Sequence, residues 1–149
     1  MDQTSTGKTD TVKLDDFLCF AIYSANHALN RVYKPLLDEI GLTYTQYIAM
    51  VTLWEQDDRT VGSLGEKLFL ESSTLTPVLK RLEGLGLIAR TRDKTDERQV
   101  RVQLTAAGRA LQARAKAIPP CILDASGLEV AELARLKEEI ATLRSSLLR

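Results

Sequence analysis

The sequence predicts a mainly α-helical fold with a small β-hairpin wing: a winged helix-turn-helix joined to a helical dimerisation domain. Apolar residues recur at helical spacing over most of the chain, the period changes to two between Ile88 and Leu104, and a helical period then returns. Two short helices precede the hairpin, and the hairpin is rich in arginine. Helix, turn, helix and basic hairpin, in that order, are the parts of a winged helix-turn-helix.

The composition indicates one domain and excludes several classes of protein. A chain of 149 residues, 44% hydrophobic and 27% charged, is long enough for a single compact core. No apolar run approaches the ~20 residues that span a bilayer, and the amino terminus lacks the apolar stretch of a secretory signal. We therefore expect a cytoplasmic protein that does not enter the membrane.

The cysteines and glycines give no sign of a metal, a cofactor or a hydrolase. Cys19 and Cys121 lie far apart in the sequence and His27 is the single histidine, so there is no zinc-ligand spacing and no CxxC pair. A glycine-rich phosphate loop and a local hydrolase motif are also missing from the sequence. We expect no metal and no cofactor.

The first predicted helix runs from about Leu14 to Glu39, after a polar arm over residues 1–13. Pro35 is expected to kink or end it, and Gly41 is a plausible stop. Its apolar face has a period of 3.6 residues and consists of Leu14, Leu18, Ala21, Ala25, Leu29, Val32 and Leu36.

The central helices are marked by capping residues. Thr43 and Gln46 form a predicted capping box that opens a helix over Tyr44–Glu55. Its core positions are Tyr47, Ile48, Val51 and Trp54. Thr60 is expected to cap a short helix that contains Leu64 and Leu68 and extends to about Phe69. A further helix is predicted from about Ser73 to Leu85, with Pro77 in its first turn.

The hairpin and the C-terminal helices complete the prediction. Strands are expected at Ile88–Arg92 and Val100–Leu104, with the polar loop 93–99 between them. Thr105 caps a helix that Pro119 and Pro120 interrupt, and a capping box over residues 126–129 opens the last helix. This last helix carries a narrow apolar stripe of Leu133, Leu136, Ile140, Leu143 and Leu147. Packing against the first helix and packing against a second copy of the chain are equally open from this pattern.

The charge is unevenly distributed, although the whole chain is formally neutral. The stretch from Ser72 to Lys116 has ten basic and four acidic residues, a net charge of +6, and so leaves −6 on the remainder. A basic segment on an acidic body indicates local contact with a polyanion. We predict that double-stranded operator DNA is contacted by Ser72, Ser73, Thr74, Thr76, Pro77, Lys80 and Arg81 of the second helix and by Arg90, Arg92, Lys94, Asp96, Arg98 and Arg101 of the wing.

Each part of this predicted interface also has a structural alternative. Serine and threonine cap helices in many proteins, so the second helix could be a capped surface helix with a solvated basic edge. At the wing tip, Arg98 suits the narrow minor groove, and Asp96 is placed to orient its guanidinium. An exposed ion pair without function is the alternative there.

Several stretches resemble a known family. The sequence from Asp96 to Gly108 is similar to the wing signature of MarR-type repressors, D-x-R-x-x-x-V-x-L-T-x-x-G. The stretches LCFA at 18–21, GLTYTQY at 41–47 and LTPVLKRLE at 75–83 resemble the organic hydroperoxide resistance regulators (the OhrR branch) of the two-cysteine type. The resemblance covers about Leu14 to the C-terminus. Thr45 departs from the pattern, since that branch usually has proline there.

The resemblance implies a homodimer whose dimerisation region is built from residues 14–42 and 106–149, around a DNA-binding region over residues 43–105. It implies that Cys19 is the thiol that reacts with organic hydroperoxide and that Tyr33 and Tyr44 hydrogen-bond it. Tyr33 follows Cys19 by roughly 21 Å along a straight helix, so a contact between them requires the second subunit. Cys121 resembles the resolving cysteine, which implies a disulfide with Cys19 across the dimer.

The sequence as a whole predicts a transcriptional repressor rather than an enzyme. The reduced homodimer is expected to bind the operator and to leave it when organic hydroperoxide, the inducer, oxidises Cys19. A close alternative is a MarR-type repressor that is released by a small phenolic ligand and whose cysteines are structural. A thiol peroxidase that uses the two cysteines catalytically is the alternative from another class, and the basic wing has no use in such an enzyme.

Overall fold

The computed structural model describes residues 11–149, so most of the predicted arm lies outside the described residues. A short 3₁₀ turn, η1 (Leu14–Asp16), precedes the helices. The helices are α1 (Leu18–Ile40), α2 (Tyr44–Glu55), α3 (Val61–Leu68), α4 (Ser72–Gly84), α5 (Ala106–Ala115), α6 (Ile118–Ser126) and α7 (Val130–Leu147), and the strands are β1 (Arg59–Thr60), β2 (Ile88–Arg92) and β3 (Val100–Leu104). The predicted fold class, mainly helical with a small hairpin wing, is confirmed.

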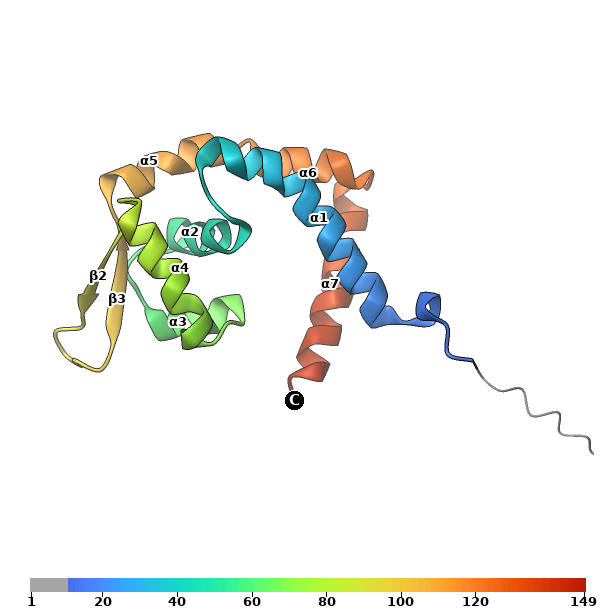
Figure 1. Ribbon diagram of the computed structural model, residues 1–149, viewed down its shortest axis with the longest axis horizontal. Coiled ribbons are helices and arrows are strands. Elements are labelled where there is room, and N and C mark those ends of the chain that lie inside the picture. Colours follow the sequence, from blue (N-terminus) through green and yellow to red (C-terminus); the bar gives the residue numbers. More distant parts are fainter. Residues whose placement is uncertain (1–10) are drawn as a thin grey trace, which may run out of the picture.

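The elements form a lobe and an arch (Figure 1). The helices α2, α3 and α4 and the strands lie together at one end of the molecule. The helices α5 and α6 and the C-terminal part of α1 lie side by side above this lobe, and α1 packs against α2, α5 and α6. The N-terminal part of α1 extends away from the lobe, whereas α7 runs from α6 back toward the end of α3, where Arg144 lies over the ring of Phe69 (Figure 1). Among residues 11–149, no helix is both long enough and apolar enough to cross a membrane.

The hydrophobic core belongs mainly to the lobe. Its largest fully buried side chains are Met50, Leu53, Leu64, Leu75, Leu79, Leu82, Ile88 and Val102. Of α1, only Leu37 and Ile40 are buried, and α7 has no buried residue. The two helices that carry the longest apolar stripes therefore leave most of these stripes exposed when one chain is taken alone.

The sheet has one more strand than the sequence predicts. The predicted hairpin is present with its predicted bounds, and β2 pairs with β3 in antiparallel register from Ile88–Leu104 to Arg92–Val100. The two-residue strand β1 joins the other side of β3, where Arg59 pairs with Val102 and Thr60 with Arg101. A strand of two residues is too short to show an alternating pattern, so it could not be read from the sequence.

Helix α1 departs from its prediction at the start. The chain forms the turn η1 and then an extended residue, Phe17, which is the N-cap of α1, so the helix begins at Leu18 and not at Leu14. Pro35 lies inside the helix and does not end it, because α1 continues to Ile40. Figure 1 shows α1 bent, as is usual for a helix that contains proline. Gly41 ends the helix in the left-handed conformation, with φ +71°, as predicted.

The predicted caps of the central helices are confirmed. Thr43 accepts from the backbone N–H of Gln46, and the Gln46 side chain accepts from the backbone N–H of Thr43. Thr60 caps α3 through the backbone N–H of Ser63. Pro77, however, is the sixth residue of α4 and lies beyond its first turn, so α4 lacks the hydrogen bond that this position would donate. The helix ends at Leu68, so Phe69 is not a helical residue but the left-handed C-cap of α3, and it is 55% exposed.

The C-terminal segments also differ in detail from their predictions. Helix α5 ends at Ala115, and Pro119 and Pro120 lie in the first turn of a separate helix, α6, that contains Cys121. Proline suits the first turn because the N–H groups there have no helical partner. Ser126 does not open the last helix, because it is the final residue of α6. The capping residues of α7 are Glu129 and Glu132 instead.

One glycine fixes how α5 meets the hairpin. A Cβ atom on Gly108 would lie 2.0 Å from the carbonyl oxygen of Leu87, far inside any tolerated contact. The carbonyl of Gly108 accepts a hydrogen bond of 2.9 Å from the indole of Trp54. The close approach joins α5, α2 and the start of the hairpin, and it sets the direction in which the wing leaves the lobe.

Candidate nucleic-acid interface and thiol site

Helix α4 presents a polar face to solvent. Leu75, Leu79 and Leu82 are fully buried and fix the orientation of the helix. The opposite face is exposed and consists of Ser72, Ser73, Thr74, Pro77, Lys80 and Arg81, with Thr76 half-buried beside it. The Thr76 hydroxyl donates to the carbonyl oxygen of Ser72 at 2.7 Å. A helix with this face outward offers hydroxyl, amide and cationic groups to a nucleic acid.

The hydroxyl groups at the start of α4 are not used as caps. The N-cap is Glu71, which makes no side-chain capping hydrogen bond. The serines and threonines therefore do not cap the helix, and the alternative of a surface helix with a solvated basic edge stays open without that capping role. Four backbone N–H groups at a helix start have no helical partner, and together with the helix dipole they attract anions.

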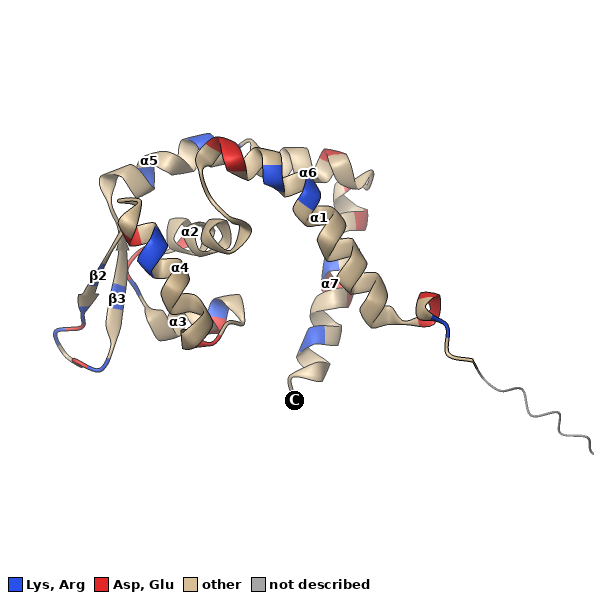
Figure 2. Cartoon of the chain, viewed as in Figure 1, with Lys and Arg blue, Asp and Glu red and all other residues tan. Residues whose placement is uncertain are grey.

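The wing carries charged residues on its strands and at its tip (Figure 2). The side chain of Arg98 is 92% exposed. The predicted contact with Asp96 is present, because Arg98 Nε lies 3.2 Å from Asp96 Oδ1. Arg92 donates from Nη1 to the carbonyl oxygen of Glu97 at 2.9 Å, and Lys94 is exposed in the same loop.

A cleft brings the wing and the start of α4 together. It has a volume of about 400 Å³ and is lined by Ser72 and Thr76 of α4. Arg90, Arg98 and Gln99 of the hairpin and Thr60 of β1 also line it. Ser72 and Arg98, which are about 25 positions apart in sequence, thus line one cleft. The cleft joins hydroxyl donors, a helix start and two guanidinium groups, which is a suitable lining for phosphate oxygens.

Besides Arg98, which pairs with Asp96, two further predicted contact residues are paired with carboxylates of the chain. Arg90 lies 3.0 Å from Glu83, which also accepts from the backbone N–H of Arg90 at 3.1 Å. These hydrogen bonds lower the pKa of the Glu83 carboxyl below its usual value. Arg101 pairs with Asp58 at 2.8 Å and with Asp93 at 3.0 Å. The positive charges that remain exposed to a polyanion are those of Lys80 and Arg81 on the outer face of α4 and of Arg92, Lys94 and Arg98 in the wing.

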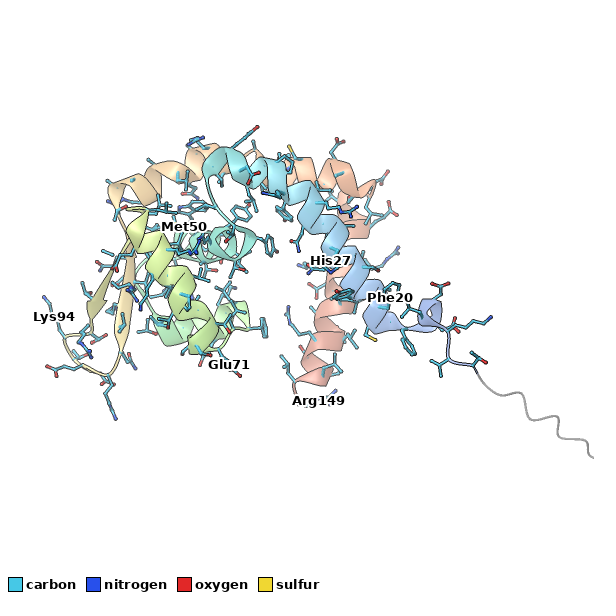
Figure 3. All side chains as sticks on the ribbon, viewed as in Figure 1. Phe20, His27, Met50, Glu71, Lys94 and Arg149 are labelled. Carbon is cyan, nitrogen blue, oxygen red and sulfur yellow. The ribbon has the colours of Figure 1, made fainter. Side chains whose placement is uncertain are left out.

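Both cysteines are free and exposed. Cys19 is the second residue of α1 and Cys121 lies in α6. Because α1 is one helix from Leu18 to Ile40, Tyr33 is ~21 Å along the axis from Cys19 and cannot reach it within one chain. Figure 3 shows Phe20, the neighbour of Cys19, on the part of α1 that lies away from the lobe containing Met50. One chain therefore brings Cys19 together with neither tyrosine nor Cys121.

The predicted tyrosines do meet each other. The ring centroids of Tyr33 and Tyr44 are 5.0 Å apart, and Tyr47, which the sequence analysis assigned to the core alone, is 6.1 Å from Tyr33. Burial, and next the neighbouring Tyr44 and Tyr47, raise the pKa of Tyr33 to about 12. Tyr33 therefore keeps its proton at neutral pH and can donate a hydrogen bond.

A cavity of about 460 Å³ opens beside this tyrosine pair. Asn26 and Asn30 line it from α1, and Thr43 lines it from the start of α2. The two asparagines are not among the site residues predicted from the sequence, although their spacing from Tyr33 places all three on one face of α1. Among residues 11–149, no cluster of His, Cys, Asp and Glu side chains is placed to hold a metal ion.

Comparisons with known proteins agree on one kind of protein. The family model described as transcriptional regulator SarA/Rot matches residues 31–114, more than half of the chain. The organic hydroperoxide resistance transcriptional regulator of Bacillus subtilis is 44% identical over 140 residues, which cover 94% of this chain and 95% of the relative. The resemblance to the organic hydroperoxide resistance regulators is thereby confirmed.

Solved structures of one further protein, AbfR of Staphylococcus epidermidis, are also similar. Reduced AbfR bound to DNA is 36% identical, with a TM-score of 0.74 over 89% of this chain and 92% of that chain. The disulfide form of AbfR is 37% identical, with a TM-score of 0.60 over 87% of this chain and 86% of that chain. The same fold is thus known with DNA bound and in a disulfide form.

Proposed function

The chain belongs to the SarA/Rot family of winged-helix transcriptional regulators, and from this premise we propose that it is a homodimeric repressor that organic hydroperoxide releases from operator DNA. Its relatives are transcriptional regulators, and we infer that it is not an enzyme and that it acts on DNA in the cytoplasm. The observation that carries the DNA-binding part is the cleft in which Ser72 and Thr76 of α4 face Arg98 of the wing.

In the proposed complex, α4 enters the major groove and the wing reaches the adjacent minor groove. Hydroxyl groups at the start of α4 contact phosphates and base edges, while Lys80 and Arg81 neutralise phosphates on its outer face. Arg98 inserts into the minor groove, where the negative potential is strong. The other groups proposed at this surface are Ser73, Thr74, Pro77, Arg92, Lys94 and Asp96.

We infer that a second copy of the chain covers the exposed apolar stripes of α1 and α7. Leu18 is 60% exposed, Ile22 37% and Leu29 43% on α1, and Leu136 is 45% and Ile140 44% exposed on α7. Burial of apolar area of this kind stabilises by about 25 cal/mol per Å². Residues 14–42 and 106–149 would form the dimerisation region, and residues 43–105 would form the DNA-binding region.

Sensing would take place across the dimer. Tyr33 lines a cavity that the Cys19 of its own chain cannot reach, so the thiol that enters it comes from the second subunit. The protonated hydroxyl of Tyr33, and that of Tyr44, donate hydrogen bonds that favour the thiolate. Cys19 is then the peroxide-reactive group of the dimer.

The proposed chemistry has two steps. The Cys19 thiolate attacks the terminal oxygen of the organic hydroperoxide, so that an S–O bond forms and the O–O bond breaks. Cys19 becomes a sulfenic acid, and the leaving alkoxide takes up a proton and departs as the alcohol. The thiol of Cys121 on the second subunit then condenses with this sulfenic acid, so that a disulfide forms and water leaves. The new bond pulls on α1 and α6, re-angles the two DNA-binding lobes and breaks their half-site spacing.

A gel shift tests the proposal. The probe is a duplex of about 30 base pairs that the reduced protein selects from a randomised pool. The reduced protein should bind it, cumene hydroperoxide should release it, and Cys19→Ser should bind equally well but ignore the hydroperoxide. Normal release of the Cys19→Ser variant would remove Cys19 as the sensor, and repeated reduction of hydroperoxide with a thiol reductant would favour a thiol peroxidase.

The cavity beside Tyr33 and Tyr44 supports a second candidate, in which a small phenolic ligand releases the DNA and the cysteines are structural. Its volume, about 460 Å³, and its asparagine and tyrosine lining suit such a ligand. A variant without both cysteines distinguishes the two. Release of its DNA by salicylate, together with resistance to hydroperoxide in the wild type, would favour the phenolic ligand.

A further inference from the structure

The guanidinium of Arg101 ties three segments of the wing together. Arg101 lies on β3, the central strand, and its Nε donates to Asp58 Oδ1 at 2.8 Å. Its Nη2 donates to the carbonyl oxygen of Asp58 at 2.9 Å, and its Nη1 donates to Asp93 Oδ2 at 3.0 Å. Asp58 precedes β1 at one edge of the sheet and Asp93 follows β2 at the other. One side chain thus joins both edges to the centre.

Asp58 anchors this network to the lobe. It lies in the turn between α2 and β1 and has the left-handed conformation, with φ +58°, which Asp and Asn adopt more readily than most residues. The preceding residue, Asp57, accepts from the backbone N–H of Leu104 at 2.9 Å. The turn is therefore bound to β3 at two points, and α2 supplies the rigid body of the lobe behind it.

Asp93 organises the wing loop. Its Oδ1 accepts from the backbone N–H of Thr95 at 2.8 Å, from the Thr95 hydroxyl at 2.6 Å and from the backbone N–H of Asp96 at 3.2 Å. Its Oδ2 is held by Arg101. The hydrogen bonds from Thr95, and next that from Arg101, hold the pKa of the Asp93 carboxyl well below its usual range. Although it lies in a loop, Asp93 is only 8% exposed.

Hydrogen bonds within the loop also hold the exposed Arg98 at the tip. Asp96 Oδ1 accepts from the backbone N–H of Arg98 at 3.1 Å and from its Nε at 3.2 Å. The backbone N–H of Gln99 donates to the carbonyl oxygen of Asp96 at 2.9 Å. Asp58, Arg101, Asp93, Asp96 and Arg98 thus form a continuous series of hydrogen bonds from the lobe to the tip.

We propose that Arg101 is a positioning residue for DNA binding, which fixes the wing loop relative to the helix-turn-helix and thereby sets where Arg98 stands. The inference rests on the proposed function, because it takes Arg98 as a DNA contact. It assigns Arg101 a role other than the direct contact that the sequence analysis gave it. Two carboxylates already neutralise Arg101, so it has little charge to offer a phosphate.

The physical reason is preorganisation. A seven-residue hairpin loop without internal partners would sample many conformations and would lose them on binding, at a cost in affinity. The network removes much of this freedom before DNA arrives. Arg101 then acts through Arg98, so removing Arg101 should matter only while Arg98 is present.

A double-mutant cycle tests this dependence with the full-length protein and the selected duplex. Arg101→Gln should weaken binding by about tenfold at fixed salt, the loss expected when one preordered contact becomes disordered. In the presence of Arg98→Ala, adding Arg101→Gln should cause less than a twofold further loss. Lys80→Gln is the matched control, because Lys80 lies on α4 outside the network. In the double variant of Lys80→Gln and Arg101→Gln, the fold losses in affinity of the two single variants should multiply.

Either of two affinity results would overturn the proposal. If the fold losses in affinity from Arg98→Ala and Arg101→Gln multiply fully in the double variant, Arg101 acts independently of Arg98. An Arg101→Gln variant with the affinity of the wild type would mean that the network does not matter. Arg101→Lys should recover only part of the affinity, because one ammonium group cannot hold two carboxylates in this geometry.

Hydrogen exchange of the free protein gives a readout that needs no DNA. The amides of Thr95 and Asp96 should exchange about tenfold faster in Arg101→Gln, while those of α2 should keep their protection. Lys94→Gln, in the same loop but outside the network, should leave these rates unchanged. If Arg101→Gln does not fold, Asp58→Asn removes one ion pair and retains a residue suited to the turn, and unchanged exchange of Thr95 and Asp96 in that variant would overturn the proposal.

The two inferences fail in different ways. If the wild type selects no duplex, the proposed function is wrong, and the exchange experiment still decides whether Arg101 orders the wing loop. If the wild type binds DNA but the cycle shows independent losses, the proposed function stands and the positioning role is wrong.

Discussion

At the scale of the residue, the arginines of the wing have the same chemistry and different surroundings. Arg98 is 92% exposed, whereas the side chain of Arg101 is 33% exposed and that of Arg90 is 22% exposed. An arginine that is already paired on two sides must break ion pairs before it binds a phosphate. Exposure and pairing, rather than the mere presence of a positive charge, therefore distinguish an arginine that contacts DNA from one that supports the contact.

Replacing Arg98 tests the contact directly. Arg98→Ala should weaken binding to the selected duplex by about 1–3 kcal/mol, because it removes a guanidinium from the minor groove. The dimer should stay intact, because Arg98 lies at the tip of the wing and is almost fully exposed. Fluorescence anisotropy at fixed salt measures the affinity, and size-exclusion chromatography checks the dimer. Unchanged affinity would remove Arg98 from the interface.

At the scale of the element, apolar side chains of the strands, Ile88, Val102 and Leu104, are buried, and hydrogen bonds to a carboxylate hold the wing loop. Its buried carboxylate, Asp93, accepts hydrogen bonds from both ends of the loop. Because the pKa of Asp93 is depressed in the folded protein, its ionised form contributes stability above the unfolded pKa of about 3.9. This contribution declines as the pH falls below that value and is lost once the folded carboxyl is protonated.

The lowered pKa of Asp93 predicts how the stability of Asp93→Asn depends on pH. The variant should be less stable than the wild type, with an almost constant difference between pH 7 and pH 5 that shrinks as the pH falls below about 4. Thermal unfolding at pH 7, 5 and 3, at one protein concentration, measures the difference. Lys94→Gln serves as the control and should show no such trend. A difference that grows toward low pH would contradict the assignment.

Another contact joins two elements that belong to different parts of the molecule. The guanidinium of Arg144 on α7 lies 4.1 Å from the centroid of the Phe69 ring, at the end of α3. It links the outlying C-terminal helix to the helix-turn-helix, and Phe69 is 55% exposed at this point. A cation–π contact at an exposed site contributes about 0.5–1 kcal/mol.

The coupling between these residues can be measured. Arg144→Gln, Phe69→Leu and the double variant form a cycle whose coupling free energy should be about 0.5–1 kcal/mol in urea unfolding at constant protein concentration. Arg135→Gln is a control on the same helix, and it should show no coupling with Phe69→Leu. A coupling of zero between Arg144 and Phe69 would show that the contact does not stabilise the protein.

At the scale of the whole molecule, one chain keeps the thiol of Cys19 apart from the tyrosines proposed to activate it. Its exposed thiol lies at one end of α1, and the tyrosine pair with its cavity lies toward the other. The proposed dimer brings the two ends together, so hydroperoxide sensing and dimerisation depend on one interface.

The disulfide across that interface gives the most direct prediction. Mild oxidation with cumene hydroperoxide should convert the protein into a covalent dimer on non-reducing gels, and reductant should restore the monomer band and DNA binding together. Cys121→Ser should abolish the covalent dimer and leave Cys19 open to sulfinic acid. The two Cα atoms must come within ~7 Å, which requires local movement of α1 or α6.

A different oxidation product would contradict the disulfide between Cys19 and Cys121. If the oxidised wild type runs as a monomer and mass spectrometry finds a mixed disulfide between Cys19 and a small thiol, the two-cysteine mechanism is wrong. Cys121 would then be an ordinary residue of α6.

The sequence by itself determined most of the secondary structure and the type of protein. The capping pair Thr43 and Gln46, the stop at Gly41 and the alternating strands on either side of loop 93–99 are local signals, because a few neighbouring residues decide them. Local motifs likewise carried the resemblance to the hydroperoxide regulators. The start of α1 was missed because Phe17 is extended, and apolar spacing does not show such a break.

Only the tertiary structure decided which charged groups have partners and which apolar faces are buried. Arg101 meets Asp58 across more than 40 positions of sequence, and Tyr33 meets Tyr44 across the junction of two helices. The short strand β1 exists because β3 pairs with it, not because its two residues favour a strand. Contacts between distant segments depend on the packing of the whole lobe, so no local pattern in the sequence encodes them.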